Sequence, residues 1–323
     1  MRYRAFGRLG WEVSEIGAGM WGMGEWTGSD DTESLASLDR AVELGCNFFD
    51  SALAYGDGHS DRLLGELVRR HPERRLHTAT KIPPLNDEWP SRRGVPLDEV
   101  FPPDHIERSL HRSLECSGLD EFDLLQFHVW EDDWLDDDRW HRAVDELRRQ
   151  KLIGGVGISI NRWEAWNGVR AVRSGAIDAV QVIYNIFDQS PEDELFPATA
   201  EMNVAVIARV PFDEGSLTGS LTADSVWPEG DWRNTYFVPE NLSATVEHVE
   251  RLKPLVPEGM TMPELALRFI LSHPAVTTAI PGMRKRSHVE ANIAASDSGP
   301  LSSGVMAALR AHRWDRQPTW WSQ

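Results

Sequence analysis

Four residues of the types that move protons each stand at or just after the end of a short apolar run. Asp50 closes the run in FFDSALAYGDGHSDRLLG, and Tyr55 follows it in a loop bounded by glycines. Lys81 closes TATK, and His128 closes DLLQFH. Taken singly, each has an ordinary structural explanation. In the same order, they could be a turn residue, a surface phenol, a solvated cation and a hydrogen-bonded core histidine. Their shared place at the ends of β-like runs indicates one common site instead.

An acid, a phenol, an ammonium and an imidazole in one site suit proton donation to a carbonyl oxygen. A free tyrosine has a pKa of about 10, which is too high for efficient general-acid catalysis near neutrality, and a neighbouring ammonium lowers it. Lys81 is the expected ammonium, Asp50 its counter-charge, and His128 a group that orients the carbonyl or relays the proton. Because no side chain supplies a hydride, reduction of that carbonyl would also require a nicotinamide.

Eight β-rich runs alternate with amphipathic helical patterns along the chain. Apolar residues recur at helical spacing, as at Leu35, Leu38 and Val42. Length alone also allows two smaller domains, but alternation without a composition break predicts one α/β domain over residues 1–323, a (β/α)8 TIM barrel with long βα loops. The opening YRAFGRLGWEVSEI predicts an added N-terminal β-hairpin that turns at Gly10. The eight runs are EIGAG, NFFD, LHTATK, FDLLQFH, IGGVGIS, DAVQVIY, VAVIARV and AVTTAIP.

In such a barrel the C-terminal ends of all strands meet at one mouth, and adjacent strands lie about 4.8 Å apart. Asp50, Lys81 and His128 are predicted to close strands two, three and four, so we expect them to lie side by side although they are far apart in sequence. Three stretches exceed ordinary loop length, which is typical of lids or binding loops. They are 83–103, 130–140 and 212–237.

The second of these loops, WEDDWLDDDRW, is rich in acidic residues and tryptophan. We interpret it as a solvated turn leading into a helix, with Asp136, Asp137 and Asp138 favouring the positive N-terminal end of that helix. A metal site is disfavoured because no matching histidine spacing accompanies these carboxylates. Tryptophans along the chain either wall a substrate pocket or pack beneath the long loops. They are Trp21, Trp89, Trp130, Trp227, Trp232, Trp320 and Trp321.

Composition narrows the class of partner and the compartment. The formal charge of −18 argues against nucleic acid and against an anionic membrane surface, since both repel an acidic protein. Cys46 and Cys116 cannot build a framework of disulfides, so a reducing cytoplasm is expected. The sequence contains no apolar signal core and no run of membrane-spanning length, so a membrane partner is not expected. It does not indicate an oligomeric state.

On these residues the chain resembles the aldo-keto reductase superfamily, over nearly its whole length. Further shared motifs are GAGMWGM, GISIN, VQVIYN, ARVPFDEGSLTG and IPGMRKRSHVEANI. The resemblance implies a barrel that binds a nicotinamide cofactor and a small-molecule carbonyl substrate. The family's catalytic Asp, Tyr, Lys and His fall on Asp50, Tyr55, Lys81 and His128, with Tyr55 as the acid. The chain is most similar to the longer-loop branch related to potassium-channel beta subunits.

The same resemblance assigns residues to the cofactor. Ser159 and Gln181 are expected to hold the nicotinamide carboxamide. Many members have an adjacent Ser-Asn pair where this chain has Ser159, Ile160 and Asn161, so the role of Asn161 stays open. An aromatic ring often stacks on the nicotinamide where this chain has Arg209, whose planar guanidinium can also stack. The other expected cofactor residues are Gly19, Met20 and Trp21 at the mouth; Val210, Pro211, Ile280 and Gly282; Phe212, Gly215, Leu217 and Gly219 in a loop over the pyrophosphate; and His288 and Asn292 at the adenosine end.

A basic run follows the last predicted strand, in MRKRSHVE. Ser287 and Glu290 fit a capping box, which places Arg284, Lys285 and Arg286 just before a helix N-terminus. Cations there oppose the helix macrodipole unless an anion offsets them, so in this acidic chain the run predicts a phosphate site. A 2′-phosphate is the natural ligand, and NADP(H) is therefore expected rather than NAD(H). No GxGxxG, GxxxxGKS or GxxxxGKT sequence is present, so those phosphate loops are not expected.

Three functions stay open from the sequence. The leading one is an NADP(H)-dependent oxidoreductase that reduces an aldehyde or ketone, or oxidises the alcohol, with Tyr55 as the general acid. A second keeps the barrel but uses Lys81 as a Schiff-base nucleophile, as in a lyase, although Asp50 nearby favours a charged and poorly nucleophilic lysine. A third is a regulatory module of the channel-beta type that holds nucleotide with slow turnover.

Overall fold

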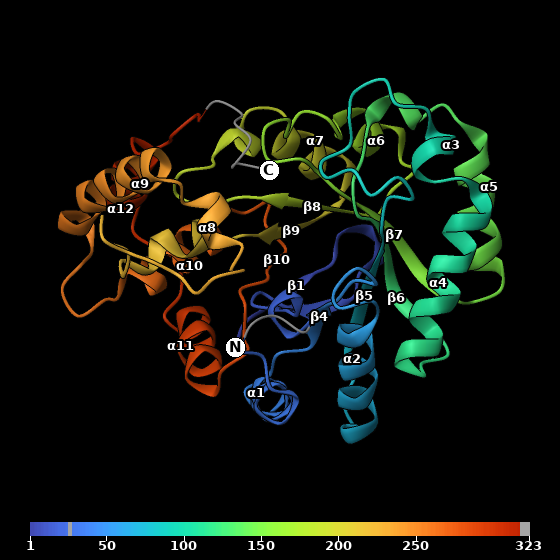
Figure 1. The fold of residues 1–323 in the computed structure, drawn as a ribbon, viewed down its shortest axis with the longest axis horizontal. Helices are drawn as coiled ribbons and strands as arrows, with labels where there is room; N and C mark the ends of the chain where they lie inside the picture. The colour runs from blue at the N-terminus through green and yellow to red at the C-terminus, as the bar shows by residue number, and fades with distance from the viewer. Residues whose placement is uncertain (25–27, 317–323) are drawn as a thin grey trace.

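The computed structural model describes residues 1–24 and 28–316 (Figure 1). An eight-stranded parallel sheet forms its centre, with strand order β10-β9-β8-β7-β6-β5-β4-β3. A parallel bridge from Ile16 to Ala279 joins the two edges, and the Gly17 amide donates to the Ala279 carbonyl at 2.8 Å. The sheet therefore closes on itself, and the predicted (β/α)8 barrel is confirmed. The strands are β3 (Ala18–Gly19), β4 (Phe48–Asp50), β5 (His77–Ile82), β6 (Phe122–Phe127), β7 (Ile153–Ser159), β8 (Ala179–Ile183), β9 (Ala205–Arg209) and β10 (Thr278–Ala279).

Helices follow the strands and cover the outside of the barrel (Figure 1). Their apolar stripes face the sheet, and the predicted residues Leu35, Leu38 and Val42 are all buried in the main core. The helices that follow β3 to β10 in turn are α1 (Asp31–Glu43), α2 (His59–Arg70), α4 (Pro103–Ser117), α5 (Asp138–Arg149), α6 (Val169–Ser174), α7 (Leu195–Met202), α10 (Met262–Leu271) and α11 (Arg286–Asp297). Additional helices are α3 (Leu97–Val100), α8 (Arg233–Tyr236), α9 (Pro239–Leu252) and α12 (Ser303–Arg310).

The predicted N-terminal hairpin closes one end of the barrel. Its strands pair antiparallel, and Gly10 between them has a φ of 67°, a left-handed conformation that favours glycine. Phe6 stacks on Phe48 at the beginning of β4, with ring centroids 5.5 Å apart, and both are fully buried. The mouth at the C-terminal strand ends is therefore left as the open side. The hairpin consists of β1 (Tyr3–Ala5), the 3-10 turn η1 (Gly7–Leu9) and β2 (Glu12–Ser14).

The acidic loop after β6 leads into α5 as predicted, but it is less solvated than expected. The Asp137 side chain accepts a hydrogen bond from the Arg139 amide at 3.0 Å and so caps α5. Trp130, Trp134 and Trp140, by contrast, are buried and pack edge to face, with the Trp130 and Trp140 rings 5.4 Å apart. All three indoles belong to the main hydrophobic core of the barrel, so this loop packs against the barrel and is only partly solvated.

No helix within residues 1–24 and 28–316 is long and apolar enough to cross a membrane. Cys46 and Cys116 are both free. Burial raises the pKa of the Cys46 thiol to about 11, which keeps it protonated and unreactive.

Candidate active site

Asp50, Lys81 and Tyr55 form one hydrogen-bonded cluster at the mouth of the barrel. Asp50, the last residue of β4, pairs in register with Ala79 of β5, so Lys81, two residues further on, points to the same side. The Lys81 Nζ donates to Asp50 Oδ2 at 2.6 Å, to the Ser51 carbonyl at 2.7 Å and to the Tyr55 hydroxyl at 3.2 Å. The structure thus brings the acid, the ammonium and the phenol into direct contact.

The charges of this cluster follow from its burial and its partners. Burial alone would lower the pKa of Lys81, but Asp50 and Tyr55 raise it above its ordinary value, so the side chain stays an ammonium. Burial raises the pKa of Tyr55; the charge of Lys81 opposes that rise and Asp50 adds to it. The net pKa of Tyr55 is therefore raised, whereas the sequence led us to expect a lowered value. The phenol is protonated and can donate its proton.

Two buried amides hold the Asp50 carboxylate in place. Gln126 Nε2 and Gln181 Nε2 each donate to Asp50 Oδ1 at 2.9 Å, and Gln181 Nε2 also lies 3.0 Å from Gln126 Oε1. Gln126 was not among the predicted residues. The sequence could have indicated it, because Gln126 of β6 lies two residues before His128. Residues two apart along an extended strand project from the same face.

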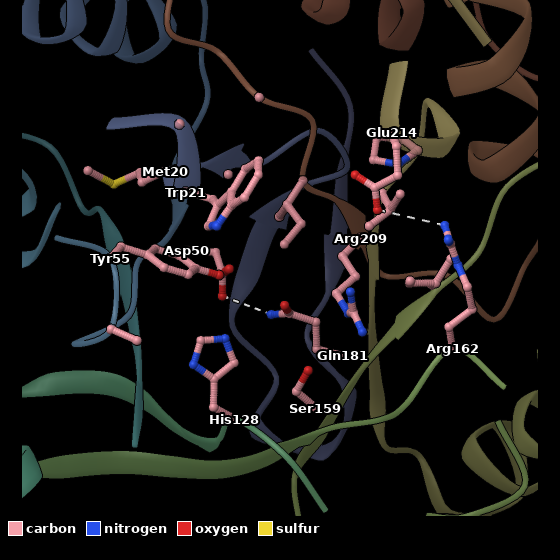
Figure 2. A pocket seen from close by; sticks show the side chains of 18 of the residues that line it. Met20, Trp21, Asp50, Tyr55, His128, Ser159, Arg162, Gln181, Arg209 and Glu214 are labelled. Carbon is pink, nitrogen blue, oxygen red and sulfur yellow. Dashed lines mark hydrogen bonds and ion pairs between the residues drawn. The ribbon is translucent and has the colours of Figure 1, made fainter. Parts of the chain in front are cut away.

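His128 faces the same cavity as Tyr55 and Asp50 (Figure 2). Its ring lies edge to face with Tyr55 at 5.6 Å and with Trp89 at 4.6 Å between centroids. Burial, followed by the charges of Lys81 and Arg209, lowers the pKa of His128 well below its ordinary value, so the imidazole is neutral. Its Nδ1 is buried and has no hydrogen-bond partner among the described residues. Such orphaned groups are rare, and one beside a cavity is typical of a site that receives a polar ligand.

One cavity of about 1010 Å³ extends from this cluster across the mouth, which is large enough for a dinucleotide. Asp50, Tyr55 and His128 line it, while Lys81 lies beneath its wall and is 1% exposed. Most residues that the sequence assigned to the cofactor also line this cavity. They are Gly19, Met20, Trp21, Ser159, Asn161, Gln181, Arg209, Val210, Pro211, Phe212, Gly215, Ile280, Gly282, Arg284 and His288.

Four residues assigned to the cofactor lie outside the cavity wall. Leu217 is fully buried in the core, and Gly219, with a φ of 74°, ends the 3-10 turn η5 (Asp213–Thr218). Asn292 is buried, and its Nδ2 donates to the Gly282 carbonyl at 3.3 Å, so it supports the cavity from behind. Arg286 is exposed and pairs with an acidic residue of its own helix. The partner is Glu290, with Arg286 Nε 3.3 Å from its Oε1.

The tryptophans divide between the cavity and the packing beneath it. Trp21, Trp89, Trp130 and Trp232 line the cavity, and the Trp21 and Trp232 rings meet edge to face at 5.4 Å. Trp227 instead stacks on an aromatic neighbour behind the wall, with its ring 5.2 Å from that of Phe237. Trp320 and Trp321 lie outside the described residues.

The basic end of the cavity differs in one detail from the prediction. Helix α11 begins at Arg286 with Lys285 as its N-cap residue and without a side-chain cap, so the capping box expected at Ser287 and Glu290 is wrong. Glu290 points instead to arginines, since its Oε1 also lies 3.0 Å from Arg40 Nε. Arg284 and Lys285 still line the cavity beside the positive end of the helix, which favours an anion there.

The shape of the loops also fits an extended anionic ligand. A Cβ atom added at Gly215 or at Gly282 would meet no atom within 4 Å, so backbone at both places borders open space. Gly215 has a φ of 101°, a conformation that favours glycine. Open backbone at two points of the wall, cations at one end and proton-active groups at the other form a donor set that suits a dinucleotide.

A second buried ionic cluster, not predicted from the sequence, lies behind the loop that follows β9. Arg316 Nη2 donates to Asp188 Oδ2 and to Asp213 Oδ1, both at 2.8 Å. Arg162 Nη1 donates to the Tyr236 hydroxyl at 2.7 Å, and its Nη2 lies 3.3 Å from Asp213 Oδ1. Burial would raise the pKa of Asp213, but Arg316 and Arg162 hold it below its ordinary value. We refer to Arg162, Asp188, Asp213, Tyr236 and Arg316 as the loop network.

A closed α/β barrel with an acid, a phenol, an ammonium and an imidazole beside a dinucleotide-sized cavity defines a class of nicotinamide-dependent oxidoreductase. The model of the aldo/keto reductase family matches residues 15–313. The chain therefore belongs to this family.

Curated relatives and solved structures agree with this membership. An uncharacterized oxidoreductase, YqkF of Bacillus subtilis (strain 168), is 28% identical over 97% of this chain and 96% of its own length. The NADH-specific methylglyoxal reductase of Escherichia coli (strain K12) is 26% identical over 88% of this chain and 90% of its own. The holo form of aldo-keto reductase AKR11C1 from Bacillus halodurans superposes with a TM-score of 0.76 and 25% identity, covering 98% of this chain and 97% of that one.

The predicted branch is also supported. A probable voltage-gated potassium channel subunit beta of Oryza sativa subsp. japonica is 26% identical over 93% of both chains. The similarity to both enzymes and channel subunits extends over almost the whole barrel, so it does not separate these functions.

Proposed function

We propose that the protein reduces an aldehyde or ketone to the alcohol with NADP(H), and that the same residues catalyse the reverse oxidation. The observation that carries this proposal is the chain of contacts from Asp50 through Lys81 to the Tyr55 hydroxyl, 2.6 Å and 3.2 Å long, at the wall of a dinucleotide-sized cavity. Membership of a family of oxidoreductases supports it. A small-molecule carbonyl substrate fits the aromatic wall around this cluster.

Each residue of the cluster has a distinct role in this proposal. When bound, the cofactor supplies a hydride to the carbonyl carbon. Tyr55 donates its phenolic proton to the carbonyl oxygen, and Lys81 stabilises the phenolate that remains. Asp50 keeps Lys81 charged. The neutral His128 hydrogen-bonds the carbonyl oxygen and orients it toward the phenol.

The preference for NADP(H) rests on the basic end of the cavity. Arg284 and Lys285 would hold the 2′-phosphate, while Arg286 is engaged by Glu290 on the exposed side of α11. The family alone does not fix this preference, because one relative is named as NADH-specific. Substituting Arg284 and Lys285 with Ala should raise the Kd for NADPH far more than that for NADH. Arg286→Ala is the matched control, and equal losses for both cofactors would refute the assignment.

Turnover tests the proposal as a whole. Consumption of NADPH and of NADH is followed with a panel of aldehydes and ketones, for the wild type and for Tyr55→Phe. We expect NADPH oxidation by the wild type and a loss of about 10²- to 10⁴-fold in kcat for the variant, the range of general acid catalysis. An undiminished rate in Tyr55→Phe would remove the proposed acid.

The channel-beta alternative is retained because a channel beta subunit is among the relatives. Tight NADPH binding without oxidation across the same panel would favour it. The lyase alternative is disfavoured, since Lys81 lies beneath the cavity wall and its pKa is raised. A single domain over residues 1–323 and a cytoplasmic location remain our predictions.

A further inference from the structure

One charged group of the cavity has no role in the reaction proposed above. Arg209 is the last residue of β9 and lines the cavity together with Ser159 of β7 and Gln181 of β8. Figure 2 shows its guanidinium turned toward Gln181 and Ser159 and away from Glu214. The Arg209 side chain therefore faces the part of the cavity that adjoins the reacting groups.

The charge of Arg209 is not neutralised by direct contact. Its Nη2 donates to the Ile160 carbonyl at 3.1 Å, and its Nε is buried without a partner. No carboxylate of residues 1–24 and 28–316 lies within 4.0 Å of its nitrogens, whereas Arg162 and Arg316 both contact Asp213. Arg209 thus presents an open positive charge to the cavity.

The charge of Arg209 acts on the neighbouring titratable groups of the cavity. Burial, followed by the charge of Arg162, lowers the pKa of Arg209, which still remains a cation because guanidinium is so basic. Burial raises the pKa of Tyr55 and lowers that of His128, and the charge of Arg209 contributes a lowering to both. A cation that influences Tyr55 and His128 also influences a ring that reacts beside them.

We propose that Arg209 makes the protein bind the reduced form of its nicotinamide cofactor more tightly than the oxidised form. This inference rests on the proposed function, because it places the nicotinamide in the cavity beside Tyr55 and His128. The reduced ring is neutral, whereas the oxidised ring carries one positive charge, since the departing hydride takes both electrons of its bond. A fixed cation therefore repels the oxidised ring and leaves the reduced ring unaffected.

The size of the effect follows from Coulomb's law. At about 5 Å and an effective dielectric constant of about 20, a full unit of charge changes a binding constant by about 300-fold. Partial compensation by Glu214, which raises the pKa of Arg209, reduces this value. We expect about a tenfold preference or more for the reduced form. In the direction of carbonyl reduction, the oxidised cofactor would then dissociate readily after the reaction.

Binding measurements test the inference without turnover. Dissociation constants for NADPH and NADP⁺ are determined by isothermal titration calorimetry for the wild type, Arg209→Gln and Arg209→Lys. The ratio of the NADP⁺ constant to the NADPH constant should be about 10 or more in the wild type and should fall about tenfold in Arg209→Gln. Arg209→Lys keeps the charge and is the matched control, so its ratio should stay within about threefold of the wild type.

Two outcomes would overturn the inference: a wild-type ratio near one, or an unchanged ratio in Arg209→Gln. If Arg209→Gln fails to fold, a wild-type ratio near one would still contradict the inference. The two proposals fail in different ways. A wild type that binds neither NADPH nor NADH contradicts the proposed function, whereas a wild type that binds both oxidation states equally contradicts only the role of Arg209.

Discussion

Two buried ionic clusters lie at the mouth of this barrel, and they are built differently. In the proposed catalytic cluster of Asp50, Tyr55, Lys81 and His128, the first and third residues are fixed by neighbouring strands whose backbones are paired in register. In the loop network, the charged residues come from segments after β7, β8 and β9 and from the end of the described chain. Strand pairing positions the first cluster, whereas the second joins loop segments through side-chain ion pairs and a backbone hydrogen bond from Trp314 to Phe187.

The two clusters also differ in what their charged and polar side chains face. Asp188 and Asp213 receive hydrogen bonds from Arg316 and balance its charge and that of Arg162. The catalytic cluster keeps a phenol and an imidazole facing the cavity, one of whose nitrogens has no partner. The loop network pairs two guanidinium groups with two carboxylates and so stabilises the folded loops, whereas the other cluster presents proton-active groups to the cavity. We therefore expect substitutions to separate stability from catalysis along this division.

Lys81→Met should have the largest effect of the substitutions that compare the two clusters. It removes the ammonium that supports the Tyr55 phenolate, so kcat should fall by about 10³-fold, within the range of proton-transfer catalysis. Steady-state kinetics measures this change, and Lys253→Met, at an exposed position on the outer surface, is the control. A Lys81 variant with near wild-type kcat would contradict the assigned role.

Arg316→Met should chiefly affect stability. It leaves Asp188 and Asp213 buried with one cation fewer, which costs about 3–5 kcal/mol in the free energy of unfolding. We also expect a higher Kd for the cofactor with little change in kcat, because the network supports the η5 loop and not the acid. Urea unfolding measures the first effect. The control Arg313→Met removes a surface pair worth less than about 1 kcal/mol, and equal losses for both variants would contradict the comparison.

Gln126→Leu should reduce catalysis more gently. It removes one of the two amides that hold Asp50 Oδ1 and leaves Gln181 in place. We expect kcat to fall about tenfold, as for the loss of one hydrogen bond to a charged group. Gln150→Leu, which removes an amide near the exposed Glu146, is the matched control. No change in kcat would mean that Gln181 alone fixes the carboxylate.

His128→Gln should have the smallest effect of these substitutions, a change in how the free energy of unfolding depends on pH. The pKa of His128 is lowered in the folded protein, so below about pH 6.5 the unfolded chain binds a proton that the folded protein does not. Stability should therefore decrease as the pH falls below that value, by at most about 1.4 kcal/mol per pH unit from this residue. His128→Gln should flatten the slope between pH 6.5 and 5. Parallel slopes for wild type and variant would show that the imidazole titrates normally.

The strands and the catalytic cluster were predictable from the sequence for a physical reason. A buried barrel strand must be a short apolar run, and a residue that ends it must lie at the mouth, so Asp50 and Lys81 were readable from local patterns. The loop network was not, because Arg162, Asp213 and Arg316 follow no spacing rule and meet only once the loops have folded.

Two other differences have simple causes. The sequence cannot give the extent of burial, which outweighs Lys81 and raises the pKa of Tyr55. It also offered a capping box with Ser287 as the N-cap residue, yet the N-cap is Lys285 and α11 begins two residues earlier than predicted, at Arg286. Motifs fix the start of a helix only to within one or two residues, and here the Glu290 side chain pairs with Arg40 of α1 instead of capping α11.

The hairpin that closes the far end of the barrel has a practical consequence. The amino group of Met1 contacts Asp297 at the end of α11, on the side opposite the mouth, whereas Arg316 lies inside the loop network. An affinity tag or a fluorescent fusion attached before Met1 should leave ligand entry undisturbed. Surface immobilisation through the amino terminus should therefore leave the mouth of the barrel accessible.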